Sequence, residues 1–245
     1  MQSNQTMKLN LLAIGVHPDD VELGCGGTIL SHLQLGHKVG IVDLTQGELG
    51  SRGSGPLRLK EAQAAGKILG VQARENLGLA DGFFENNKES QLAVIGAIRK
   101  YQPDIILCNA PNDRHPDHGR AAKLVADAAF LSGLIRIETL DENGLLQQHW
   151  RPKVVYHYIQ ALFIKPDLVV DVTGYMDKKM ESVLAYRSQF YDPNSKEPDT
   201  FISSPEFLDM VKARAIEFGT IIGAQYGEGF IANRYIGVKD LFHLM

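Results

Sequence analysis

The stretch LNLLAIGVHPDD, residues 9–20, joins a nearly continuous apolar run to a short cluster of polar side chains. An apolar run without alternation is typical of a central parallel strand that helices cover on both faces. The cluster His17-Pro18-Asp19-Asp20 follows the predicted strand directly. In open α/β sheets, ligands bind in the crevice beyond the carboxyl ends of the strands. The stretch therefore predicts both a fold class and the position of a site.

The next hundred residues continue the alternation of strands and helices. We expect helices at residues 26–35, 57–69 and 89–101, and strands at residues 37–44, 75–77 and 104–108. Gly36 and Gly70 directly follow two of these helices, which is where helix C-terminal caps favour glycine. Short connections between alternating strands and helices predict an open, mostly parallel sheet of the Rossmann-like α/β class, with helices on both faces.

The second half of the chain is less regular. We expect strands at residues 154–159, 168–172 and 230–238, and helices at residues 177–190 and 206–222. A loop with three prolines separates the two helices at residues 191–205. Because no linker or internal repeat divides the chain, we interpret residues 1–245 as one domain. It would consist of a Rossmann-like core at residues 8–135 and a smaller C-terminal α+β extension at residues 150–245 that completes the site.

Composition and charge argue against several classes of protein. The formal net charge is −4, and basic residues form no stripe, so a nucleic-acid partner is not expected. No apolar run approaches the length of about 20 residues that crosses a bilayer, and residues 1–7 lack the layout of a signal peptide. Cys25 and Cys108 lie among small or apolar neighbours, as reduced buried thiols do. We therefore expect a cytoplasmic protein.

A second polar cluster lies far along the chain, at residues 109–118 (NAPNDRHPDH). It directly follows the strand predicted at residues 104–108. Carboxyl ends of parallel strands meet at one edge of the sheet, so this cluster is expected to face residues 17–20 across the same crevice.

These two clusters contain the residue types that hold a catalytic zinc ion. Such a site uses three protein ligands, commonly imidazole and carboxylate, and keeps one position for water. His17 and Asp20 could share one ion, and either His115 or His118 would complete the set. Asp19 would then be free to act as general base on water whose pKa the ion lowers. Such a site would also accept Fe²⁺, Co²⁺ or Mn²⁺.

Simpler interpretations of these residues exist. A pair of aspartates at the start of a helix can cap that helix and complement its dipole. Capping alone does not explain two His-Pro-Asp clusters, each at the end of a predicted strand. The glycine-rich stretch at residues 22–27 is similar to a loop that holds S-adenosylmethionine, but residues 17–21 separate it from the strand. Close packing of a helix on the sheet is the simpler role for these glycines.

Several segments resemble the LmbE-like, or PIG-L, family of zinc-dependent sugar N-deacetylases. The specific ones are GVHPDDVELGCGGT, residues 15–28, and NDRHPDHGRAA, residues 112–122. The resemblance extends through VGIVDLT, LRLKEAQAAGKILG, YRSQF and YGEGF, and so covers most of the chain. Within the family, the chain is most similar to enzymes of the bacillithiol pathway that deacetylate N-acetylglucosaminyl malate.

The resemblance implies a division of roles between the two clusters. His17, Asp20 and His118 would bind one zinc ion per subunit, so that His118 is the ligand of the second cluster. Asp19 would be the general base.

Other roles also come only from the resemblance. His115 would stabilise the oxyanion and protonate the leaving amine, and Asp117 would orient it. Arg58 and Arg151 match arginines that the family places at the substrate, although either could be an ordinary surface arginine. Two further residues are weaker candidates for lining the site: Glu48 and Tyr226.

The expected reaction is metal-assisted hydrolysis of the acetamide of an N-acetylglucosamine conjugate, which releases acetate and the free aminosugar. The alternatives are deacetylation of a chitobiose-like sugar and cleavage of the amide of a thiol conjugate. A non-catalytic sugar- or nucleotide-binding module would be expected to lack at least one of the five residues with proposed metal or proton-transfer roles. All five are present: His17, Asp19, Asp20, His115 and His118. Similar proteins are often trimers or hexamers, so a homo-oligomer is expected.

Overall fold

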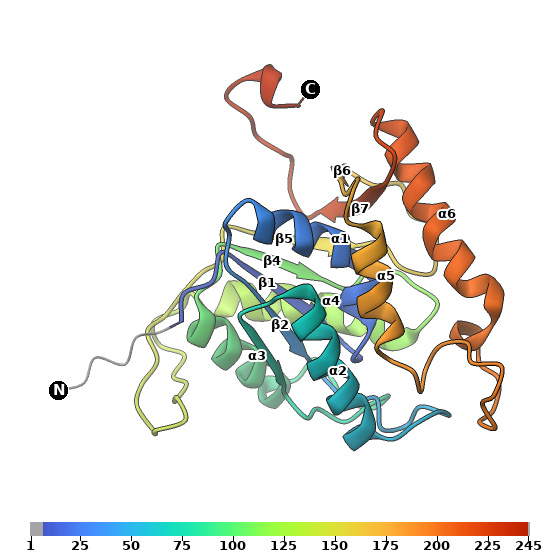
Figure 1. Cartoon of the computed structure of the whole chain (residues 1–245). Helices are drawn as coiled ribbons and strands as arrows, with labels where there is room; N and C mark the ends of the chain where they lie inside the picture. The colour runs from blue at the N-terminus through green and yellow to red at the C-terminus, as the bar shows by residue number, and fades with distance from the viewer. Residues whose placement is uncertain (1–6, 245) are drawn as a thin grey trace.

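A computed structural model describes residues 7–244 and shows one seven-stranded sheet (Figure 1). Its strands are β1 (Leu11–Gly15), β2 (Val39–Asp43), β3 (Ala73–Asn76), β4 (Ile105–Cys108), β5 (Val154–Tyr158), β6 (Leu168–Asp171) and β7 (Gly227–Ala232). The strand order is β3-β2-β1-β4-β5-β7-β6. The first five strands in this order pair in parallel, and β7 is antiparallel to both of its neighbours. The mostly parallel α/β fold is as predicted, and the strands of the second half extend the same sheet.

Helices cover both faces of this sheet. They are α1 (Asp20–Gln34), α2 (Gly55–Leu69), α3 (Lys88–Tyr101), α4 (Pro116–Leu131), α5 (Met176–Leu184) and α6 (Pro205–Ile221), with two short 3-10 helices, η1 (Phe201–Ser203) and η2 (Leu241–Leu244). α3 and α4 pack on one face, and α1 and α2 pack on the other. α5 packs on α1 and α2, and α6 packs on β7 (Figure 1).

The apolar run that opened the sequence is buried on both sides. All five residues of β1 are buried. Leu12 and Ile14 pack into the cluster beneath α3 and α4, whereas Leu11 and Ala13 pack into the cluster beneath α1 and α2. Each buried leucine or isoleucine contributes roughly 1.5–3 kcal/mol relative to an exposed one. This double burial explains why the run shows no alternation of polar residues.

The strand order places a crevice beside β1. On one side of β1 lies β2, the strand that follows it in the sequence. On its other side lies β4, which comes much later in the chain. Ile14, one residue before the end of β1, pairs with Cys108 at the end of β4, so the two strands end at nearly the same level. Such a reversal of strand order is where open α/β sheets bind ligands.

α1 begins at Asp20, well before the predicted start at residue 26, and it is broken. Cys25 has non-helical backbone angles, φ −148° and ψ 21°, so a second helical segment follows it. The Glu228 carboxylate accepts hydrogen bonds from the backbone N–H groups of Gly27 and Thr28 at the start of that segment. Only the segment after the break matches the helix predicted at residues 26–35.

Three other elements differ from the prediction. α4 was not expected, α5 ends at Leu184 rather than near residue 190, and β7 spans Gly227–Ala232 rather than residues 230–238. The two glycines of β7 lie close to other elements, since a Cβ on Gly229 would come within 2.7 Å of the Phe218 ring on α6. Glycine is therefore required inside this strand, where the sequence pattern indicates a loop.

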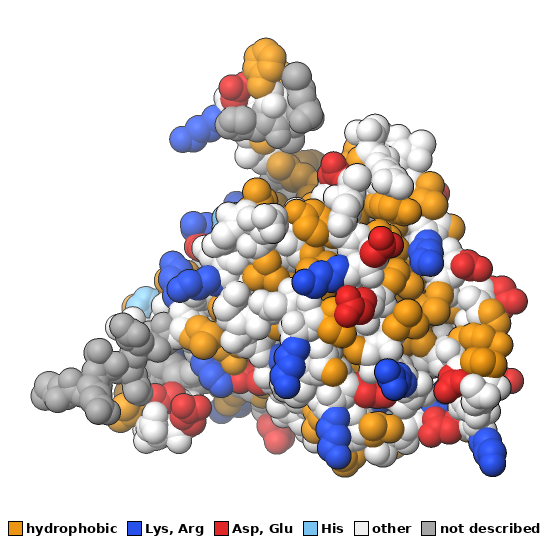
Figure 2. Space-filling view, viewed as in Figure 1, with side chains coloured by type: hydrophobic (Ala, Val, Ile, Leu, Met, Phe, Trp, Pro, Cys, Tyr) orange, Lys and Arg blue, Asp and Glu red, His pale blue; other side chains and the backbone are white. Residues whose placement is uncertain are grey.

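The surface shows no feature of a large charged interface on the side drawn in Figure 2. Acidic, basic and apolar side chains are interspersed there, and the C-terminal tail projects from the body. Within the described residues, none of the helices has both the length and the apolar character of a membrane span.

Candidate metal centre and active site

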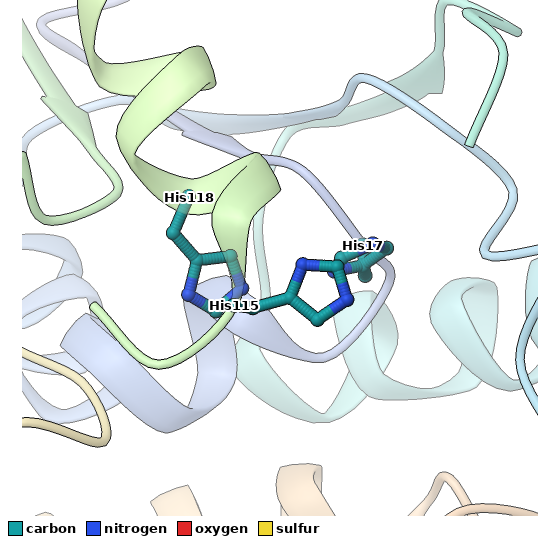
Figure 3. Close-up of side chains that lie close together, drawn as sticks. All are labelled: His17, His115 and His118. Atoms are coloured by element: carbon teal, nitrogen blue, oxygen red, sulfur yellow. The ribbon is translucent and has the colours of Figure 1, made fainter. Parts of the chain in front are cut away.

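The two polar clusters meet beyond the ends of β1 and β4. His17 follows β1, and His115 and His118 stand at the start of α4 (Figure 3). The ring centroid of His17 lies 4.8 Å from that of His115 and 5.8 Å from that of His118. The structure therefore brings together the side chains that the strand-end argument predicted.

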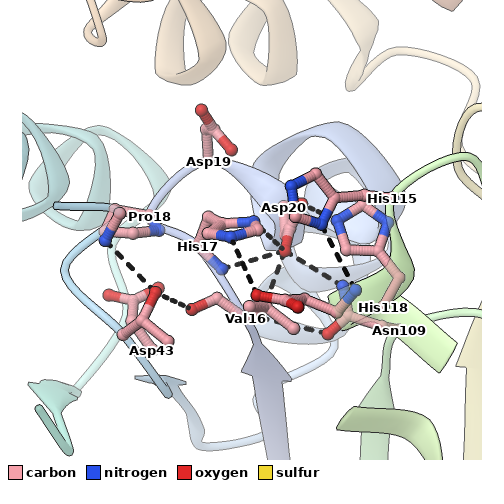
Figure 4. A network of polar contacts seen from close by, with 12 residues as sticks. Val16, His17, Pro18, Asp19, Asp20, Asp43, Asn109, His115 and His118 are labelled. Carbon is pink, nitrogen blue, oxygen red and sulfur yellow. Dashed lines mark hydrogen bonds and ion pairs between the residues drawn. The ribbon is translucent and has the colours of Figure 1, made fainter. Parts of the chain in front are cut away.

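Asp20 is held at the centre of this site by hydrogen bonds from four groups (Figure 4). Its Oδ2 atom accepts the backbone N–H groups of Val16 and His17, at 3.1 and 3.0 Å, and the Asn109 side-chain amide at 3.0 Å. Its Oδ1 atom accepts the Gln160 amide at 2.8 Å. These donors fix the orientation of the carboxylate.

The two histidines beside Asp20 share one arrangement. His17 turns Nδ1 towards Asp20 at 3.6 Å and places Nε2 3.0 Å from Asp81. His118 turns Nε2 towards Asp20 at 3.2 Å and places Nδ1 2.5 Å from Asp113. Histidines that bind metals nearly always donate their other ring N–H to such a partner, commonly a carboxylate. Each ring thus turns one nitrogen to Asp20 and the other to a second carboxylate.

These separations fit a small divalent cation. In a tetrahedral zinc site with bonds of about 2.0–2.1 Å, ligand atoms lie about 3.3 Å apart. Asp20 Oδ1 lies 3.2 Å from His118 Nε2, and the other oxygen, Oδ2, lies 3.6 Å from His17 Nδ1. Imidazole and carboxylate are also the donors that zinc prefers. His17, Asp20 and His118 therefore present donors of the kind that zinc binds.

Neighbouring carboxylates raise the pKa of both histidines. Burial alone would lower the pKa of His17, but its hydrogen bonds with Asp20 and Asp81 raise it to about 9. Burial also opposes protonation of His118, yet the Asp20 charge and the Asp113 hydrogen bond raise the pKa of His118 to about 10. A bound metal would displace a proton from each ring, since only neutral imidazole is a ligand.

In two groups of potential ligand atoms, the atoms lie within 4.8 Å of one another, and both groups include His17. The first is His17, His115 and His118, and the second is His17, Asp81 and Asp117. The Asp117 carboxylate, however, already accepts the backbone N–H of Gly82 at 2.9 Å and bonds Arg120 at 2.7 Å. This group also lies on the Nε2 side of His17, which is the side that Asp81 uses to orient the ring.

Asp19 lines the cavity but points away from the Asp20 network (Figure 4). Its backbone has φ 121° and ψ −26°, a conformation that costs a non-glycine residue roughly 1–3 kcal/mol. The Arg58 guanidinium bonds the Asp19 carboxylate at 2.9 Å and the Pro18 carbonyl at 2.5 Å. Burial raises the pKa of Asp19 to about 7, against the lowering effect of Arg58. Asp19 thus lies next to the proposed ligands, but its carboxylate takes no part in their hydrogen-bond network.

His115 differs from the other two histidines in its hydrogen bonds. Its Nδ1 atom accepts the backbone N–H of Asp117 at 3.3 Å, so the neutral ring carries its hydrogen on Nε2. Burial lowers the pKa of His115, and the charges of His17 and His118 lower it further. The resemblance implied that Asp117 orients His115, and the contact that does so comes from the Asp117 backbone.

A cavity of about 270 Å³ opens onto these residues. Its lining combines residues of the two clusters with a set of apolar side chains. The apolar lining comes from η1, α6 and the end of β5, and includes Phe201, Ile202, Phe207, Met210, Val211, Phe218 and Ile159.

The two predicted substrate arginines are in different places. Arg58 lines the cavity, but its guanidinium is bonded to Asp19. Arg151 does not line the cavity, because it lies at the other end of α4, over the Phe130 ring at 4.2 Å, and donates to the Phe130 carbonyl. The structure therefore does not support a contact between Arg151 and substrate in the same chain.

The two weaker candidates, Glu48 and Tyr226, make their contacts outside the cavity lining. Glu48 accepts the backbone N–H of Asp81 at 2.9 Å, which helps to place that carboxylate. Tyr226 packs against a cluster with Met176 and Met180. Neither side chain is among those that line the cavity.

Four residues that fix the site had no role in the sequence-based prediction. They are Asp81, Asn109, Asp113 and Gln160. Asn109 and Asp113 belong to the second cluster, and Gln160 directly follows a predicted strand. Polar residues at strand ends were therefore the signal, whereas Asp81 lies in a loop beyond β3 and had none.

Comparison with known proteins finds related sequences. The sequence pattern of the family described as "PIG-L: GlcNAc-PI de-N-acetylase" matches residues 12–129. A diacetylchitobiose deacetylase of Thermococcus kodakarensis is 28% identical, over 96% of this chain and 88% of that protein. A probable N-acetyl-α-D-glucosaminyl L-malate deacetylase 2 of Bacillus anthracis is 27% identical, over 74% of this chain and 81% of that protein.

A solved structure extends the likeness to the whole fold. The conserved protein TT1542 of Thermus thermophilus superimposes with a TM-score of 0.83 and 34% identity. The match covers 94% of this chain and 98% of that one. It therefore includes the strands and helices of the second half. The chain belongs to the PIG-L family, also called LmbE-like.

Proposed function

We propose that this protein is a zinc-dependent hydrolase that removes the acetyl group from an N-acetylglucosamine conjugate. One observation carries the proposal. His17 and His118 each turn one ring nitrogen to Asp20 and bond a second carboxylate with the other nitrogen. Two relatives named as deacetylases of glucosamine-containing compounds support the choice of reaction.

The proposed ligands are His17, Asp20 and His118. A divalent ion held there would polarise the acetamide carbonyl and lower the pKa of a water molecule. Asp19, next to Asp20 and lining the cavity, accepts the proton of the attacking water. Arg58 keeps the Asp19 carboxylate in place for this transfer.

His115 acts on the other side of the reacting carbon. Its Nε2–H donates a hydrogen bond to the carbonyl oxygen as negative charge develops there. The water oxygen bonds to the carbonyl carbon, the carbon–nitrogen bond breaks, and the amine takes the proton that Asp19 received. The resemblance implied that His115 delivers this proton as an imidazolium; because burial and the charges of His17 and His118 lower the pKa of His115, we assign the delivery to Asp19. Acetate and the free aminosugar leave.

The proposed substrate is N-acetylglucosaminyl malate, as in bacillithiol biosynthesis, and the alternative is a chitobiose-like sugar. Both relatives named above act, by their names, on compounds that share an acetylated glucosamine. A homo-oligomer, trimeric or hexameric, stays a prediction.

We expect the purified protein to release acetate from N-acetylglucosaminyl malate with a higher kcat/KM than from N,N′-diacetylchitobiose or N-acetylglucosamine. Acetate and free amine should appear in equal amounts, because one amide bond yields both. A coupled acetate assay and an amine-reactive dye measure the two products separately. Binding of these sugars without any product would contradict the proposed reaction and favour a non-catalytic sugar-binding module.

A further inference from the structure

The connection between α5 and α6, residues 185–204, supplies part of the cavity lining. Three of its residues line the cavity: Gln189, Phe201 and Ile202. Between them, residues 191–199 are all exposed and belong to no helix or strand. Because such a segment buries little apolar surface of its own, its position depends on contacts with other elements.

Arg52 makes such contacts from the loop between β2 and α2, which lies beside the α5–α6 connection (Figure 1). All three nitrogens of its guanidinium donate hydrogen bonds to the connection. Nε donates to the Ser188 carbonyl at 2.9 Å, Nη1 to the Pro198 carbonyl at 3.1 Å, and Nη2 to the Ser195 hydroxyl at 3.0 Å. Arg52 is 4% exposed. Hydrogen bonds from a charged donor are stronger than those between neutral groups, so this buried side chain attaches the connection firmly.

Further hydrogen bonds extend this attachment. The backbone N–H of Gly53 donates to the Glu197 carboxylate at 2.9 Å, and the Gln189 side-chain amide donates to the Arg52 carbonyl at 2.9 Å. On α2, the Glu61 carboxylate accepts the backbone N–H and the hydroxyl of Ser188, at 2.8 and 2.7 Å. Arg52 therefore lies within a continuous polar interface between the two segments.

The loop that carries Arg52 also contacts the proposed catalytic groups. The backbone N–H of Leu49 donates to Asp81 at 2.9 Å, and the Gly47 carbonyl accepts a hydrogen bond from Arg58 at 3.5 Å. Asp81 bonds a proposed metal ligand, and Arg58 bonds the proposed base. One loop thus joins the α5–α6 connection to the groups that orient the reacting side chains.

We propose that Arg52 is a positioning residue for substrate binding, because it holds the α5–α6 connection in the place where Phe201 and Ile202 form a wall of the cavity. The inference rests on the proposed deacetylase function and adds a determinant of substrate affinity. Arg52 itself does not line the cavity, so it acts through the connection. If the connection were attached for only part of the time, the apparent affinity for substrate would fall in proportion to the attached fraction.

Three variants test this role. Arg52→Gln removes the charge and leaves one donor nitrogen in place of three. Arg52→Lys keeps the charge on one nitrogen, without the planar arrangement of donors. Ser195→Ala removes one acceptor from the exposed side of the contact and leaves the loop of Arg52 unaltered.

Arg99→Gln is the matched control. Arg99 is also buried, at 2% exposure, and it also holds a loop through backbone carbonyls: those of Ser132, Leu134 and Ile137. Residues 132–139 do not line the cavity. The control therefore removes a comparable set of hydrogen bonds at a distance from the substrate.

Each protein is measured in two ways. Hydrogen exchange of residues 185–204, followed by mass spectrometry without substrate, reports how firmly the connection is attached. Steady-state acetate release from N-acetylglucosaminyl malate gives KM and kcat separately.

We expect Arg52→Gln to speed exchange in residues 185–204 and to raise KM roughly tenfold, as an attached fraction of one tenth would do. Its kcat should change little, because the proposed ligands and base keep their contacts. Arg52→Lys and Ser195→Ala should lie between Arg52→Gln and wild type in both measurements. Arg99→Gln should speed exchange in residues 132–139 and keep the wild-type KM.

Three results would overturn the inference. They are unchanged exchange in Arg52→Gln, faster exchange with an unchanged KM, and an equal rise of KM in Arg52→Gln and Arg99→Gln. If Arg52→Gln does not fold, Ser195→Ala decides by the same criteria, since its substitution is at an exposed residue.

Failure of the proposed function gives a different result. Wild-type protein would then release no acetate, and the dissociation constant of N-acetylglucosaminyl malate, measured by calorimetry, would replace KM. A roughly tenfold weaker binding in Arg52→Gln would still support the positioning role. Equal binding by Arg52→Gln and wild type would contradict it.

Discussion

Asp19→Asn is expected to lower kcat for acetate release by about 10²–10⁴-fold, which is the usual contribution of a general base. The amide of asparagine keeps the size of the side chain but cannot accept the proton of the attacking water. Because Asp19 points away from the Asp20 network, the zinc content of the variant should equal that of wild type. Steady-state kinetics and metal analysis of the same preparation check both expectations.

The control for this variant is Asp209→Asn on α6, where an exposed aspartate lies outside the cavity. It should behave as wild type in both measurements. Turnover by Asp19→Asn within tenfold of wild type would contradict the assignment of the base. Loss of zinc from Asp19→Asn would instead move Asp19 into the set of ligands.

Removal of His118 and removal of His115 should have different effects, although the two rings lie 5.3 Å apart. His118→Ala loses one of three ligands, so we expect it to lose both zinc and activity. His115→Ala loses a hydrogen-bond donor to the carbonyl oxygen, so we expect it to keep zinc and to lose about 10²–10³-fold in kcat. Metal analysis after dialysis, together with the rate of acetate release, gives the comparison.

His149→Ala is a suitable control because His149 is exposed and does not line the cavity. Equal loss of zinc in the His115 and His118 variants would mean that both rings are ligands. Loss of zinc from His115→Ala alone would reverse the assignment. This comparison tests the hydrogen bonds of the two rings. The backbone N–H of Asp117 donates to Nδ1 of His115, and the Asp113 carboxylate bonds Nδ1 of His118.

The sequence predicts the central part of the fold well because burial is unambiguous there. β1 is apolar throughout, since it packs against helices on both faces. Predictions of secondary structure fail where glycines or polar loop residues obscure the pattern of a strand or a helix. β7 contains glycines because α6 packs closely on it, and α4 starts inside the second polar cluster, where His115 caps it. Its buried Ala121, Leu124, Val125 and Ala128 follow the helical period, so that pattern could have revealed the helix.

The site divides in the same way. The meeting of His17 with His115 and His118 could be predicted, because strand ends of a parallel sheet lie at one edge. The part played by Asp81 could not, because it depends on how the loop after β3 folds back towards β1. Arg58 and Arg151 were both expected at the substrate. In the structure Arg58 bonds Asp19, whereas Arg151 donates to the carbonyl of Phe130 on α4. Contacts of that kind are tertiary, and local sequence does not determine them.

The central claim is that one metal ion at His17, Asp20 and His118 supports the hydrolysis. Its most direct test is a titration of chelator-treated protein with zinc, in which bound metal and acetate release are followed together. We predict negligible activity without metal, and activity that rises in proportion to bound zinc until one ion per chain is held. Full acetate release by protein that holds no metal would contradict the claim.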